Sequence, residues 1–196
     1  MFDYPAPRAE RIHGPAGYIS CESFRPWLRD EFMFRCIYCL KRESWGQATG
    51  EFELDHFQPQ SIVPQRSLDY LNLVYACRRC NSVKLEQLVD DPCVVLSSDS
   101  VVVLPDGRIR SNQPAARKLI QQLDLNSPKL KRWRVMWLRI FELAAKWDAK
   151  LYEQLVGFPD DLPNLGRLRP PSNSRPDGIE VSCYAKRQRG QLPTTY

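Results

Sequence analysis

The sequence predicts an α+β fold, in which a region of short strands that contains paired cysteines is flanked by helical segments. Between residues 35 and 92, two C-x-x-C pairs enclose short runs rich in aromatic and β-branched residues. Between residues 114 and 155, apolar residues recur at three- and four-residue steps, the period of a helix. The chain has 196 residues, which suits one domain of ordinary size or one domain with an extension.

Residues 1–34 are expected to form an N-terminal arm followed by a short helix. The arm, residues 1–19, is rich in Pro, Gly and polar side chains and lacks the basic and apolar regions of a secretion signal. The helix is predicted for residues 22–34, where Pro26 would lie in the first turn and its missing N–H would cost little. Its apolar side would carry Phe24, Trp27, Leu28 and Phe32.

Residues 35–92 are predicted to form a separate core. After the first cysteine pair we expect a short strand through Phe52 and Leu54. A proline-containing loop follows, and residues 68–77 predict a second strand that leads into the second cysteine pair. A helix is expected from about Asn81 onward and would stop before the Asp-Pro pair that closes this region.

Residues 93–196 predict a basic, mainly helical extension with an irregular tail. Two Val-rich runs around a Ser/Asp turn predict a small hairpin over residues 94–110. Residues 114–123 favour a short helix. Ser127 and Pro128 supply an N-cap and a first-turn proline for a long helix.

The apolar stripe of this long helix is interpreted as core packing rather than as a cofactor site. Its members are Leu130, Trp133, Trp137, Phe141, Ala144, Leu151 and Leu155. Residues 157–196 show little periodicity, and the final ten are expected to be mobile. No apolar run reaches the length that a membrane-spanning helix requires.

Positive charge is concentrated behind the cysteine-containing region. The formal net charge is +5, but residues 1–107 sum to −4 and residues 108–150 sum to +8, with eleven Lys and Arg against three Asp and Glu. Such a patch can contact phosphate backbones, or it can be a solvated helix face, and charge alone leaves both alternatives open.

The two C-x-x-C pairs predict a structural zinc site. They comprise Cys36, Cys39, Cys77 and Cys80. Four thiolates complete a tetrahedral Zn²⁺ site and leave no open coordination position. The alternatives are four buried small side chains, or a redox protein with stoichiometric disulfides and no zinc. The remaining cysteines, Cys21, Cys93 and Cys183, are expected to be ordinary thiols. The odd count of seven fits a reducing compartment, here the cytoplasm.

Polar residues between the cysteine pairs are the candidates for chemistry. They are the adjacent Asp55 and His56 at a predicted strand end, Asn72 before the second cysteine pair, and Asn81 directly after it. The only other histidine is His13 in the predicted arm, so His56 is the candidate for a base that works near neutral pH.

These residues, in the runs CIYC, ELDH and LNLVYACRRCNSVK, resemble the zinc-stapled form of the HNH endonuclease family. The resemblance covers residues 35–92 and implies a ββα-metal fold of two antiparallel strands and a helix around one divalent ion. It implies that His56 is the general base and that Asn72 holds this histidine in place. It further implies that Asp55 and Asn81 ligate the catalytic metal. The motif departs from its name at the last position, where Asn81 replaces a histidine.

The physical chemistry agrees with these roles. Hydrolysis of a phosphodiester requires a deprotonated water and a cation beside the phosphate. A carboxylate and an amide oxygen favour Mg²⁺ or Mn²⁺ over Zn²⁺. Asp55 and His56 are neighbours in a strand and point to opposite faces, so a local distortion near Gln58 and Pro59 is expected. The alternative role of Asp55 is a capping group.

Basic residues around the second cysteine pair and at the start of the long helix are the predicted nucleic-acid contacts. They are Arg78, Arg79, Lys84, Lys131 and Arg132. The alternative for them is plain solvation. No base-reading module is recognisable, so no sequence specificity is predicted.

The function predicted from the sequence is a metal-dependent endonuclease that acts on nucleic acid, with double-stranded DNA as its substrate. By analogy with compact HNH proteins, the chain is expected to be an effector in a bacterial anti-phage or restriction system, paired with an ATPase or a sensor. The alternative is a non-catalytic, zinc-stapled nucleic-acid-binding or scaffolding subunit. Filled catalytic-type positions argue against that alternative.

Overall fold

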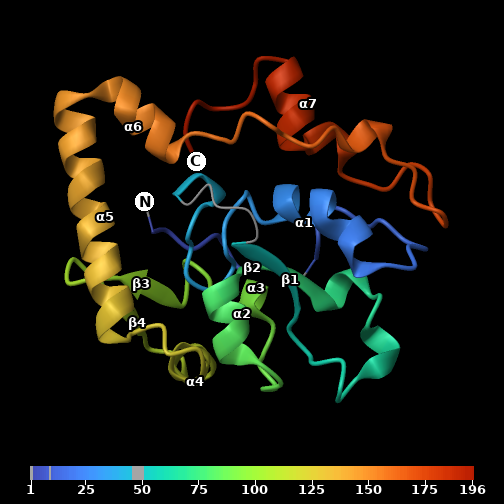
Figure 1. Ribbon diagram of the computed structural model, residues 1–196, viewed down its shortest axis with the longest axis horizontal. Coiled ribbons are helices and arrows are strands. Elements are labelled where there is room, and N and C mark those ends of the chain that lie inside the picture. Colours follow the sequence, from blue (N-terminus) through green and yellow to red (C-terminus); the bar gives the residue numbers. More distant parts are fainter. Residues whose placement is uncertain (1, 9, 46–50) are drawn as a thin grey trace.

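The computed structural model describes residues 2–8, 10–45 and 51–196, and it combines helices with short strands (Figure 1). The helices are α1 (Arg25–Glu31), α2 (Arg78–Lys84), α3 (Pro92–Val95), α4 (Pro114–Gln122), α5 (Pro128–Trp147), α6 (Ala149–Val156) and α7 (Cys183–Gln188). The strands are β1 (Phe52–His56), β2 (Leu73–Cys77), β3 (Val101–Val103) and β4 (Ile109–Ser111).

The centre of the fold is a ββα unit made of β1, β2 and α2. The strands pair antiparallel, with Asp55 opposite Val74 and His56 opposite Leu73. All five residues of β2 are buried. Helix α2 follows β2 directly and begins at Arg78, three residues before the expected start, because the extended backbone of Cys77 forms its N-cap. The predicted α+β core is thereby confirmed.

The segment after the core differs in part from the predicted hairpin. The second Val-rich run forms β3, which pairs with β4. The first run lies in helix α3 instead. Asp91 accepts a hydrogen bond from the backbone N–H of Cys93 (2.8 Å), and Pro92 occupies the first turn. An N-cap and a first-turn proline start a helix, and they override the β propensity of the valines.

Helix α5 begins as expected but is shorter than the predicted apolar stripe. Its N-cap Ser127 accepts from the backbone N–H of Leu130 (3.4 Å). Asp148 ends α5 with a non-helical backbone and caps α6 by accepting a hydrogen bond from the backbone N–H of Leu151 (2.9 Å). This break turns Leu151 outward, where it is 40% exposed. The expectation that Leu151 is core was therefore wrong.

An aromatic cluster joins α5 to the central region. The rings of Trp45 and Trp137 stack with centroids 4.6 Å apart, and Trp133, Phe2 and Phe141 pack edge-on or tilted against them. The prediction that Trp133 and Trp137 of α5 pack inward is confirmed, whereas Trp147 at the end of the helix is exposed. Phe2 is buried, so the N-terminal segment is part of the core and not a free arm.

The C-terminal segment is also packed, in contrast to the expected mobile end. In Figure 1 it runs from α6 across the molecule above α1. The Tyr196 ring lies 4.4 Å from the Phe158 ring and 4.0 Å from the Arg42 guanidinium. The backbone N–H of Tyr196 donates to Val156 (3.1 Å). Isolated anchors of this kind leave no periodicity in a sequence.

One hydrophobic cluster includes residues from all three predicted segments, residues 1–34, 35–92 and 93–196. The shared core does not mark a boundary between them, so the division into segments stays a prediction. Within the described ranges, no helix has both the length and the hydrophobicity to cross a bilayer.

Candidate active site

His56 lies at the end of β1, where its ring is held by the following loop. Its Nε2 lies 2.8 Å from the carbonyl oxygen of Ser67. A carbonyl can only accept, so Nε2 carries the proton in this contact and Nδ1 keeps the lone pair. The nitrogen that can take a proton from water is therefore Nδ1. His56 is only half-buried, which leaves its ring within reach of solvent.

Asn72 is fully buried and fastens the loop that holds His56. Its Oδ1 accepts from the backbone N–H of Gln58 (3.0 Å), and its Nδ2 donates to the carbonyls of Gln58 (3.0 Å) and Arg66 (3.2 Å). Arg66 directly precedes Ser67, whose carbonyl contacts the imidazole. The amide therefore fixes both ends of the loop and, through it, the orientation of His56.

Asp55 points to the opposite face of β1 and is buried in a pair with Lys84. Its Oδ1 lies 3.0 Å from the Lys84 Nζ, and its Oδ2 accepts from the Tyr38 hydroxyl (2.7 Å). The ammonium also donates to the backbone carbonyl of His56 (2.7 Å). Burial and the nearby carboxylate raise the pKa of Tyr38 well above its usual value, so its hydroxyl keeps the proton that it donates.

Asn81 lies one helical turn before Lys84, on the same face of α2. Its Nδ2 donates to the Glu53 Oε2 (2.7 Å), and Arg78 pairs with the same carboxylate (3.0 Å). Glu53 and Asp55 are two residues apart in β1 and share a face. The Asn81 amide is thus oriented by the hydrogen bond from its nitrogen, and its Oδ1 can serve as a ligand for a cation.

The four paired cysteines form one cluster. Their sulfurs all lie within 4.8 Å of one another, and the Sγ atoms of Cys39 and Cys77 are 3.7 Å apart. A tetrahedral zinc with bonds of about 2.3 Å separates its sulfurs by about 3.8 Å, so the donor set fits Zn²⁺. Burial raises the pKa of Cys36, while hydrogen bonds from neighbouring thiols lower that of Cys77.

All seven cysteines are described, and all are free thiols. Four of the seven sulfurs form a single cluster that could hold a metal ion.

The basic residues predicted to contact nucleic acid have different environments. Arg78 is 64% exposed and Arg132 is exposed, while Lys131 is half-buried. Arg79 donates to the carbonyl of Leu123 (2.7 Å) at the end of α4. Lys84 is only 1% exposed, and its ammonium is taken up by Asp55. The expectation that Lys84 contacts nucleic acid is corrected: the register of α2 on β1 turns it inward.

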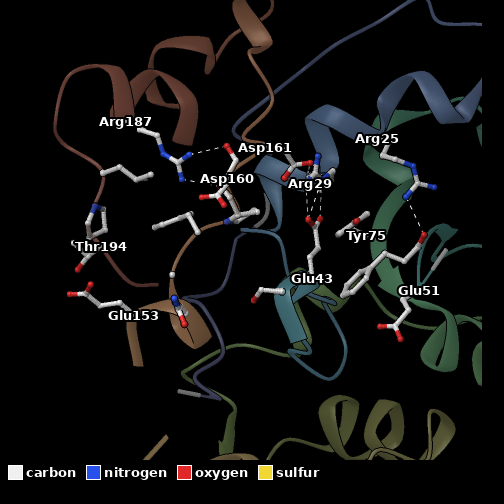
Figure 2. Close-up of a pocket in the computed structure, with 18 of the residues that line it drawn as sticks. Arg25, Arg29, Glu43, Glu51, Tyr75, Glu153, Asp160, Asp161, Arg187 and Thr194 are labelled. Atoms are coloured by element: carbon white, nitrogen blue, oxygen red, sulfur yellow. Dashed lines mark hydrogen bonds and ion pairs between the residues drawn. The ribbon is translucent and has the colours of Figure 1, made fainter. Parts of the chain in front are cut away.

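A cleft of about 1350 Å³ lies elsewhere, between α1, β1, β2 and the C-terminal segment (Figure 2). Three of its charged side chains form ion pairs with one another. Arg29 binds both Glu43 (2.8 Å) and Asp161 (2.9 Å). None of Asp55, His56, Asn72 or Asn81 lines this cleft. The residues of the candidate active site thus lie outside it.

Three residues near the site were missed by sequence reasoning. Glu53 could have been found, because the two-residue period of a strand places it on the face of Asp55. Tyr38 and Cys21 carry no such signal. Tyr38 reaches Asp55 from inside the first cysteine pair, and the Cys21 sulfur lies 3.8 Å from the His56 Nε2.

The ββα unit, the thiol cluster and the loop-held histidine occur in one continuous stretch. Residues 36–86 match the family model of the HNH endonucleases. The match starts at the first clustered cysteine and includes every residue proposed for the HNH site, so the predicted resemblance is confirmed. It covers 51 of the 196 residues. An HNH domain indicates a nuclease or nucleic-acid-binding function. No curated protein is a significant match to the chain.

Proposed function

We propose that this chain is a metal-dependent endonuclease that hydrolyses phosphodiester bonds, with double-stranded DNA as its substrate. The observation that carries the proposal is the state of His56 within the HNH match. Its Nε2 is held by the Ser67 carbonyl, and its Nδ1 is left with a lone pair. A histidine fixed in one tautomer at a half-exposed strand end is equipped to deprotonate a water molecule.

Asp55 and Asn81 are the proposed ligands of the catalytic cation, Mg²⁺ or Mn²⁺. The donors are a carboxylate and an amide oxygen, which suit a hard cation. Each carboxylate oxygen of Asp55 already has one partner but keeps a second lone pair. The cation, when bound, would neutralise charge on the phosphate.

The roles of the other residues follow from their contacts. Asn72 holds the loop that orients His56, and Glu53 holds the amide nitrogen of Asn81 so that its oxygen is free. Lys84 balances the charge of Asp55. The thiol cluster would hold one structural Zn²⁺, whose closed tetrahedral shell has no place for substrate.

Substrate contacts are proposed for the basic residues that face solvent. Arg78 lies at the start of α2 beside the site, and Arg132 and Lys131 lie at the start of α5. Pairing with an ATPase or sensor protein in bacterial defence rests on analogy. Seven cysteines, four of them in a cluster that could hold a metal ion, fit a reducing compartment, and we place the protein in the cytoplasm.

The test is incubation of zinc-loaded protein with plasmid DNA and Mg²⁺ or Mn²⁺. His56→Ala is expected to lower the cleavage rate by about 10²- to 10⁴-fold, which is the usual contribution of a general base. Zinc content and melting temperature should not change. Gln65→Ala alters an exposed residue of the same loop and should cleave normally. A wild type that binds DNA but does not cleave it would instead support the non-catalytic alternative.

A further inference from the structure

Cys21 lies against the catalytic histidine although it belongs to neither cysteine pair. It begins the 3-10 turn Cys21–Phe24 that precedes α1. Its Sγ is 3.8 Å from the His56 Nε2 and 3.2 Å from the carbonyl oxygen of Ser67. The amide end of Gln60 lies 3.2 Å from the same Nε2. A thiol, an imidazole and oxygen donors therefore surround one point.

We propose that Cys21 and His56 form a second metal site, which takes a thiophilic divalent cation such as Zn²⁺ or Cd²⁺ and switches off the proposed nuclease. A tetrahedral zinc with bonds of about 2.3 Å to sulfur and about 2.0 Å to nitrogen separates those two atoms by about 3.5 Å. The observed 3.8 Å is close to this separation.

Oxygen donors can complete the shell. The Ser67 carbonyl oxygen lies 2.8 Å from Nε2. It must withdraw by about half an ångström for a cation to enter, since a zinc separates its nitrogen and oxygen ligands by about 3.4 Å. The Gln60 amide can present its oxygen, because its two terminal atoms are interchangeable by rotation. Gln60 is exposed and Cys21 is half-buried, so a cation can reach the site.

Binding would remove the base. The cation replaces the Cys21 thiol proton, which leaves to solvent, and takes the Nε2 lone pair. The imidazole remains neutral, and its one proton moves from Nε2 to Nδ1. The lone pair proposed to accept the proton of water is then lost. Mg²⁺ would not act in this way, because it prefers oxygen ligands and binds thiolates poorly.

The site is separate from the four-cysteine cluster, whose sulfurs come from the two C-x-x-C pairs. Two cysteines serve as matched controls. Cys93 and Cys183 are also single thiols, and both are buried. The Cys183 thiol donates to the Met33 sulfur (3.8 Å).

The first experiment measures binding without nucleic acid. Protein loaded with one Zn²⁺ is titrated with Co²⁺, and the sulfur-to-cobalt charge-transfer band is recorded. We expect the band in the wild type and in Cys93→Ser, and its loss in both Cys21→Ser and Cys21→Ala. Equilibrium dialysis should show a second equivalent of Zn²⁺ that the two Cys21 variants lack. A band that persists without Cys21, or a wild type that binds only one equivalent, overturns the proposal.

The second experiment measures the consequence, which rests on the proposed function. Zn²⁺ is added to a cleavage reaction at fixed Mn²⁺, and each variant is compared with its own rate without added zinc. Cys21→Ser should need at least about 10-fold more Zn²⁺ for half-inhibition than the wild type and Cys93→Ser. Equal sensitivity overturns the switch. A protein that binds the second zinc but never cleaves would refute the nuclease and leave the metal site standing.

Discussion

The buried pair of Asp55 and Lys84 gives the sharpest test of the site's energetics. Lys84→Met removes the ammonium that lies 3.0 Å from the Asp55 carboxylate and leaves Tyr38 as the remaining partner of that carboxylate. At this distance the Coulomb attraction is about 5 kcal/mol with an effective dielectric constant of about 20. Removing one partner of a buried pair costs about 3–5 kcal/mol. We expect a loss of about 4 kcal/mol in the free energy of unfolding.

The assay is urea unfolding of zinc-loaded protein at pH 7, applied to Lys84→Met, Asp55→Asn and the double variant. The double variant should be more stable than the sum of the two single losses predicts, by about 3 kcal/mol, because it leaves no unpaired charge behind. If Lys84→Met lowers the free energy of unfolding by less than about 1 kcal/mol, the reasoning is refuted. Additivity of the two losses within about 0.5 kcal/mol would do the same.

Three further predictions concern metal and pH. Cys77→Ser should release the zinc and lower the melting temperature, since structural zinc contributes folding energy; unchanged melting would contradict this. Glu53→Ala should weaken Mn²⁺ binding by about 10-fold in calorimetry, because it frees the amide of Asn81. Glu51→Ala, which breaks a pair with Lys41 instead, is its control, and equal affinities would remove Glu53 from the site. Burial raises the pKa of Cys93 to about 11, so the folded thiol keeps a proton that the unfolded thiol loses near pH 9. Stability should be full below pH 9 and fall by about 2–3 kcal/mol as the pH rises to 11. Unfolding of Cys93→Ser over that range should show a shallower decline, and an equal slope would exclude this thiol as the cause.

The parts of the fold that the sequence predicted are those set by local chemistry. The two C-x-x-C pairs predict the cluster of four sulfurs. The ELDH run and Asn72 are recognised as candidates from their positions between these pairs. Ser127 and Pro128 start a helix because a cap and a first-turn proline act on their own turn. For such features the neighbouring residues carry the information.

The parts that escaped prediction depend on contacts between distant residues. Lys84 is predicted from the sequence to contact nucleic acid because basic side chains near a helix start attract phosphate. Its true partner, Asp55, is set by how α2 lies on β1. Phe2 and Tyr196 are single aromatic residues in segments without periodicity, and only the packed core reveals that each is an anchor. Cys21 lies close to His56 because the turn that precedes α1 packs beside the end of β1.

The four-cysteine cluster and the proposed catalytic cation site are connected by residues that neighbour the cysteines in the chain. Tyr38 lies between the cysteines of the first pair and donates to Asp55, while Asn81 directly follows Cys80 of the second pair. A zinc ion bound by the four sulfurs would therefore also hold the backbone on both sides of the proposed catalytic cation. This arrangement explains how a short two-stranded sheet and a seven-residue helix can hold reacting groups in register. Elements of this size are marginal on their own, and a zinc ion bound by the four thiolates would add rigidity to them.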